Sequence, residues 1–293
     1  MNIVIWIIVI AAGVAAFYSM RKTRRKYLFQ TPPSKFELHL IEEVEELSDK
    51  LEESLDPDYM ESVRERVAEQ TLLLPNEWDW RYLELKRYFI MCSLLKKVPM
   101  FSEEVDDVWH EMIMFTHKYE DFTSTYYEQF LHHEPNITKR RNPDSRGFFD
   151  WVYGILFPIY KESEKLYGKF YRYPVHPDII IEFQLDSDEE LKKRYFTSYP
   201  FSQEAVGHLI QVMKQQALQL HNASKADVMK KQSNIEAGVD PIMLLFLYES
   251  FTNYDHFNSH HTSYDSSCSS CSSSDSHSSA DHSSCSSCGG GGD

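Results

Sequence analysis

Acidic and histidine side chains, which can bind metals or move protons, gather in one short stretch of the chain. Asp106 and His110 stand four residues apart, and His117, His132 and His133 follow closely. Two residues four apart on a helix share one face, which is the spacing used when a helix offers two ligands to one metal ion. This stretch is therefore the candidate site.

The elements around these residues must be helical for that spacing to matter. Ser102 is a suitable N-cap, and the acids that follow it suit the positive end of a helix dipole. On a helix over about 103–121, the residues predicted to face the core are Val105, Val108, Trp109, Met112, Phe115, Thr116 and Tyr119. A narrow strip beside them holds Asp106, His110, His117 and Asp121, and the residues predicted to face water are Asp107, Glu111 and Lys118.

One metal ion cannot be shared by all the histidines. His110 and His117 are seven residues apart, or about 10 Å along a helix, so the pattern predicts a site of Asp106 and His110 completed by His132 or His133. A histidine beside a core is also commonly held by an acid through a hydrogen bond. The residue pattern favours such a structural Asp106–His110 pair over metal binding, and metal binding over acid–base catalysis, which also needs a substrate pocket.

A second set of metal-binding residue types lies at the C-terminus. Its cysteines form two Cys-x-x-Cys pairs, at Cys268, Cys271, Cys285 and Cys288. This spacing is compatible with zinc, but a folded zinc module also needs turns and apolar support. Because serine fills most of the intervening positions, we expect a disordered tail over 253–293 that either captures metal loosely or acts as a spacer.

The N-terminus carries an apolar run from Ile3 to Met20, followed by five basic residues within 21–26. As a helix the run spans roughly 27 Å, close to the thickness of a bilayer core. A cleaved signal peptide would carry its positive charge before the run. We therefore predict a transmembrane anchor at 3–20 in the cell membrane, with the N-terminus outside and the C-terminal domain in the cytoplasm.

The remainder of the chain is strongly acidic. Five of the 30 Lys and Arg residues lie in the basic collar, which leaves 25 against 45 Asp and Glu residues. Such a surface is repelled by phosphate backbones, so we expect no nucleic-acid partner.

Apolar residues recur at helical spacing through most of the chain, without sustained strand alternation. The pattern predicts an all-α fold with three parts: the anchor and collar at 1–26, a helical cytoplasmic domain at 27–252, and the tail at 253–293. The predicted helices cover about 34–54, 57–75, 77–98, 103–121, a following segment to about 131, 144–169, 187–197, 202–221 and 240–251. The stretch 171–183, with Pro174 and Pro177, is predicted to be irregular.

The candidate stretch also resembles a known family. The residues Val105-Asp106-Asp107-Val108-Trp109-His110, then Thr116, Tyr119 and Phe122, then Phe130-Leu131-His132-His133-Glu134-Pro135 are similar to the VDxVWH…HHxP signature of an uncharacterised group. That group is related to glycine-rich-domain proteins, and some bacterial members have a membrane helix and a Ser/Cys/Gly-rich end. Thr123 stands where a cysteine is often found, and Glu128 or Gln129 where a glycine is common. The resemblance implies that His110, His132 and His133 act together, and it implies no reaction.

Two functions follow as expectations. The first is a non-enzymatic docking or scaffold role for the helical domain, with a protein partner near the membrane. The second is a metal-dependent role, with zinc or another divalent ion at Asp106, His110, His132 and His133.

Overall fold

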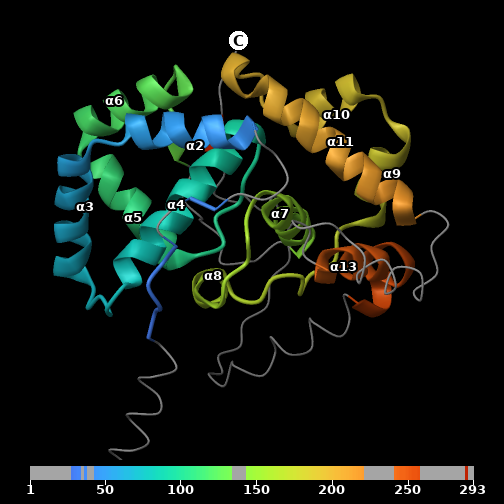
Figure 1. The fold of residues 1–293 in the computed structure, drawn as a ribbon, viewed down its shortest axis with the longest axis horizontal. Helices are drawn as coiled ribbons and strands as arrows, with labels where there is room; N and C mark the ends of the chain where they lie inside the picture. Colours follow the sequence, from blue (N-terminus) through green and yellow to red (C-terminus); the bar gives the residue numbers. More distant parts are fainter. Residues whose placement is uncertain are drawn as a thin grey trace, which may run out of the picture.

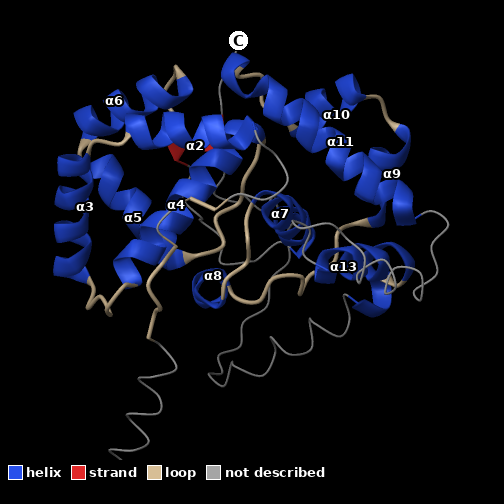
Figure 2. Cartoon of the chain, viewed as in Figure 1, coloured by secondary structure: helices blue, strands red, loops and turns tan. Residues whose placement is uncertain are grey.

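The computed structural model describes residues 28–33, 36–37, 43–133, 143–220, 241–257 and 288–289. Helices make up nearly all of the regular structure in these ranges (Figure 2), which confirms the all-α prediction. They are α2 (Glu43–Ser54), α3 (Pro57–Gln70), α4 (Glu77–Leu94), α5 (Glu103–Met114), α6 (Thr116–Tyr127), α7 (Pro143–Leu156), α8 (Lys161–Tyr167), α9 (Pro177–Leu185), α10 (Asp188–Tyr195), a 3-10 turn η1 (Pro200–Ser202), α11 (Gln203–Leu220) and α13 (Pro241–Thr252). Two short strands, β1 (His132–His133) and β2 (Cys288–Gly289), pair antiparallel.

The predicted membrane anchor at 3–20 lies outside the described residues, as does most of the predicted tail. Within the described ranges, every helix is too short or too polar to cross a bilayer.

The helices form two neighbouring groups (Figure 1). Helices α2 to α6 lie on one side, where α4 packs on α2 and α5, α3 packs on α5, and α6 packs on α2 and α5. Helices α9, α10, α11 and α13 lie on the other side, and α7 and α8 lie between them. The ends of α4 and α10 join the groups through backbone hydrogen bonds, from Lys96 N to Tyr195 O (3.0 Å) and from Thr197 N to Leu94 O (2.9 Å). One continuous apolar core runs through both groups.

Three predicted elements differ from the structure. The helix expected over 103–121 breaks at Phe115, whose ψ of 64° is not helical, so α5 and α6 are separate. The helix expected over 144–169 ends at Leu156, two residues before Pro158, and resumes as α8. The stretch expected to be irregular contains α9, because Pro177 occupies a first-turn position, where a proline costs no hydrogen bond.

Close packing fixes α7 against the chain that follows α8. A Cβ atom at Gly147 would lie 2.2 Å from the Pro174 carbonyl oxygen, so only glycine allows this approach. This contact holds α7 at the boundary between the two helical groups.

Candidate metal centre

Helix α5 presents the first two candidate residues. The Ser102 hydroxyl accepts a hydrogen bond from Val105 N (3.2 Å), which confirms the predicted N-cap. Val105, Val108, Trp109 and Met112 are all fully buried, as the helical pattern predicts. With that face fixed in the core, Asp106 and His110 lie one turn apart at its edge.

Strand β1 brings His133 to these two residues. Its Nε2 lies 2.8 Å from Asp106 Oδ1, and His110 Nε2 lies 3.8 Å from Asp106 Oδ2. One ligand atom from each of Asp106, His110 and His133 falls within 4.8 Å of the other two. We call these three residues the histidine cluster.

The histidine cluster lies at the protein surface. The side chain of His133 is 6% exposed and that of Asp106 is 15% exposed, whereas His110 is 47% exposed. The ring centroids of His110 and His133 are 4.6 Å apart, and the two ring planes meet at 68°. Two members are therefore held by the protein, and the third opens to solvent.

Buried aromatic residues hold His133 in place. Its ring packs edge-on against Trp109 at 4.2 Å. Trp109 Nε1 donates to the Tyr119 hydroxyl (3.0 Å), which donates to the carbonyl of Leu131 (2.7 Å), two residues before His133. Burial raises the pKa of Tyr119, so its hydroxyl keeps the proton that this second bond requires.

His132 does not join the histidine cluster. Adjacent residues on a strand point to opposite sides, and the ring of His132 lies against Phe130 at 4.9 Å. His117 is also elsewhere, on α6 beyond the break at Phe115. The structure thus brings together three of the four residues predicted for this site.

Strand β2 runs beside the histidine cluster. Its register places Cys288 opposite His133 and Gly289 opposite His132. Cys268, Cys271 and Cys285, the other predicted tail ligands, lie outside the described residues.

One expected surface residue is in fact buried. Glu111, predicted to face water, is 8% exposed and binds two side chains of α3, Arg66 Nε at 2.5 Å and Gln70 Nε2 at 2.7 Å. The helical pattern gives the direction of a side chain but not the neighbouring helix that covers it.

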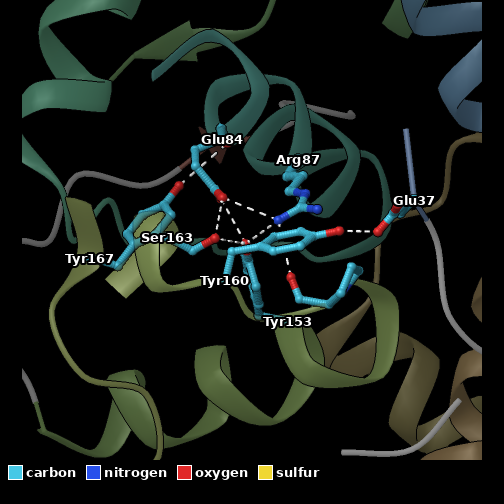
Figure 3. A network of polar contacts seen from close by, with 8 residues as sticks. Glu37, Glu84, Arg87, Tyr153, Tyr160, Ser163 and Tyr167 are labelled. Atoms are coloured by element: carbon cyan, nitrogen blue, oxygen red, sulfur yellow. Dashed lines mark hydrogen bonds and ion pairs between the residues drawn. The ribbon is translucent and has the colours of Figure 1, made fainter. Parts of the chain in front are cut away.

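A second polar group, which the sequence pattern did not reveal, lies inside the domain (Figure 3). Glu84 and Arg87 of α4 are both fully buried and form an ion pair at 3.1 Å. Glu84 also accepts from the hydroxyls of Tyr153 (2.7 Å) and Ser163 (2.6 Å). We call these four residues the Glu84 network. Its trace in the sequence is a pair of opposite charges three residues apart, Glu84 and Arg87, and the exposed-type charge of Lys86 between them gives no sign that the pair is buried.

Arg87 is the centre of the Glu84 network. Its Nη1 donates to Glu84, to the Tyr153 hydroxyl (2.8 Å) and to the Pro158 carbonyl (3.2 Å). Burial acts to lower the pKa of Arg87, but Tyr153 and Glu84 raise it more, so the guanidinium stays charged. Its remaining face lies over the rings of Phe157 and Tyr160, at 5.3 Å and 5.4 Å from their centroids.

Comparison with known proteins gives one similarity. Residues 53–149 match the family described as UCP032817-like. The match supports a relation to an uncharacterised family, and it includes all of α5, α6 and β1. No curated protein and no solved structure matches the chain.

Proposed function

We propose that this protein binds a divalent metal ion through Asp106, His110 and His133, in a helical domain anchored to the cell membrane. The observation that carries the proposal is the convergence of three donor atoms from two separate elements within 4.8 Å. Two imidazoles and one carboxylate are ligands that zinc and iron(II) both accept.

The geometry requires only a small adjustment to hold an ion. Ligand atoms about 2.1 Å from a tetrahedral zinc ion lie roughly 3.4 Å from one another. Asp106 and His133, at 2.8 Å, share a hydrogen bond and would separate slightly, while His110, at 3.8 Å from Asp106, would approach. An ion would replace the proton that Asp106 and His133 share.

Three protein ligands leave a coordination position open, for water or for a further residue. A water molecule at this position would complete a tetrahedral zinc site.

The membrane part of the proposal rests on the sequence. The apolar run at 3–20 has the length of a bilayer-spanning helix, and the basic collar at 21–26 favours a cytoplasmic domain. Labelling of single cysteines added at residue 185, where Leu185 is 78% exposed, and at the N-terminus of membrane-embedded protein tests the orientation. Reaction of residue 185 from outside intact cells would overturn it.

Elemental analysis of the full-length protein, purified in detergent, tests the metal site. We expect about one zinc or iron ion per chain, lost in His110→Ala and retained in the matched control His132→Ala. Protein without bound metal, and without measurable affinity for added Zn²⁺ or Fe²⁺, would overturn the proposal and leave docking of a protein partner as the second candidate.

A further inference from the structure

The chain that leaves the proposed anchor is fixed to the folded domain at 28–30. Lys165 Nζ donates to Leu28 O (2.5 Å), Asn76 Nδ2 to Phe29 O (3.2 Å), and Trp80 Nε1 to Gln30 O (2.6 Å). The Lys165 ammonium also lies over the Phe29 ring, 4.9 Å from its centroid. At residues 28–30, the chain that follows the proposed anchor is therefore bound to the folded domain and is not a free linker.

The fixed segment emerges beside the loop between α3 and α4 (Figure 1). This loop, residues 71–75, has the sequence Thr-Leu-Leu-Leu-Pro. Leu72 is 88% exposed, and Leu28 in the fixed segment is 44% exposed. An apolar loop tip and an apolar chain entry thus lie at the same end of the domain.

The distance to the bilayer is short at this end. Seven residues lie between Met20, the end of the apolar run, and Leu28. Even fully extended, the eight steps from Met20 to Leu28 span at most about 28 Å, and the polar headgroup layer takes up part of that length. The collar within 21–26 adds five positive charges there, which attract anionic lipid headgroups at close range.

We propose that the loop 71–75 is a second membrane contact, with Leu72 inserted into the headgroup region of the bilayer that holds the anchor. The inference rests on the membrane anchor of the proposed function and is independent of the metal site. Its occupant is a lipid surface because the segment fixed at this end, residues 28–30, follows an apolar run of bilayer length. It orients the domain with the α3–α4 loop and α8 toward the membrane.

Depth-dependent fluorescence quenching tests the contact. Full-length Leu72→Trp is reconstituted in vesicles of phosphatidylcholine and phosphatidylglycerol, with or without brominated acyl chains. The four native tryptophans of the described domain are buried (Trp78 at 8% exposure is the most open), and Trp6 of the proposed anchor is present in every variant. The quenching of wild-type emission is therefore subtracted as the background. Leu185→Trp is the matched control, because Leu185 is 78% exposed at the end of α9, in the other helical group.

We expect brominated lipid to quench the added emission of Leu72→Trp at least threefold more than that of Leu185→Trp. In the same vesicles, Leu72→Asp should increase the rate of amide hydrogen exchange in the loop 71–75 about 10- to 100-fold. This factor corresponds to the free energy of burying one leucine side chain. Equal quenching of both tryptophans, in chains that float with the vesicles, would overturn the contact while leaving the anchor intact. Chains that fail to float would overturn both, and unchanged metal content would show that the metal site stands separately.

Discussion

The histidine cluster and the Glu84 network are built from similar chemistry and differ in what surrounds it. In the Glu84 network both ions are fully buried and paired with each other, and the Tyr153 and Ser163 hydroxyls donate to Glu84. Arg87 Nε and Nη2 have no hydrogen-bond partner among the described residues, but they are enclosed in the core, where a ligand cannot reach them. In the histidine cluster, Asp106 and His133 pair with each other, but His110 is 47% exposed and approaches Asp106 only to 3.8 Å. The ring nitrogens of His110 are therefore available to bind a ligand.

This difference separates a polar group that holds the fold from one that is available to a ligand. A buried ion pair is costly to desolvate, and removing one partner costs more because the other is left alone. A half-exposed imidazole carries little of that cost. The Glu84 network should therefore control stability, and the histidine cluster should control binding.

The largest expected effect is in the Glu84 network. Arg87→Met leaves Glu84 as an uncompensated buried charge and should lower the free energy of unfolding by about 3–5 kcal/mol in urea denaturation. Lys86→Met, next to it on α4, breaks an ion pair with Glu52, whose side chain is 46% exposed, and should cost about 0–1 kcal/mol. The double variant Glu84→Met/Arg87→Met should recover most of the loss. If Arg87→Met and Lys86→Met lower the free energy of unfolding equally, the Glu84 network stabilises the fold no more than an exposed ion pair does.

Acidification should affect the histidine cluster and not the Glu84 network. Both imidazoles must be neutral to bind a metal ion, so protons compete with the metal. Metal affinity, measured by competition with a chelator, should therefore fall as the pH is lowered. An affinity that stays constant between neutral and mildly acidic pH would contradict the assignment of two histidine ligands.

Tyr119 connects the buried core to the histidine cluster, so its removal should affect both stability and binding. Tyr119→Phe leaves Trp109 Nε1 and the Leu131 carbonyl without their partner, and should cost about 1–3 kcal/mol of stability. Because Leu131 leads into β1, metal affinity should also fall about 10- to 100-fold. Tyr126→Phe is the control on α6, since that hydroxyl makes only a 3.4 Å contact with Ser93. If both variants bind metal equally, the aromatic residues do not position His133.

The candidate site could be predicted from the sequence as far as one helix determines it. The Ser102 cap, the buried face of α5 and the shared edge of Asp106 and His110 all follow from local spacing, and the structure confirms them. The choice between His132 and His133 could not be made, because it depends on how β1 lies against α5. A strand shifted by one residue would exchange their two faces.

The fold shows the same limit. The all-α class follows from periodicity, but the break at Phe115 does not, because helical spacing continues through a residue whose backbone is not helical in the structure. The Glu84 network was missed for a related reason. Its members come from α4, α7 and α8, so only the assembled fold brings Glu84, Tyr153 and Ser163 together.

His110→Ala should have the smallest effect on stability, and it tests most directly whether the histidine cluster controls binding while the Glu84 network controls stability. His110→Ala removes a side chain that is 47% exposed, so the free energy of unfolding without metal should change by no more than about 0.5 kcal/mol. His133→Ala, at a side chain that is 6% exposed and packed on Trp109, should cost about 1–2 kcal/mol. Both variants should nevertheless lose the rise in melting temperature that added Zn²⁺ gives the wild type, because a ligand stabilises only the state that binds it. A His110→Ala variant that still gains the full Zn²⁺ stabilisation would mean that His110 is a surface residue beside a structural Asp106–His133 pair.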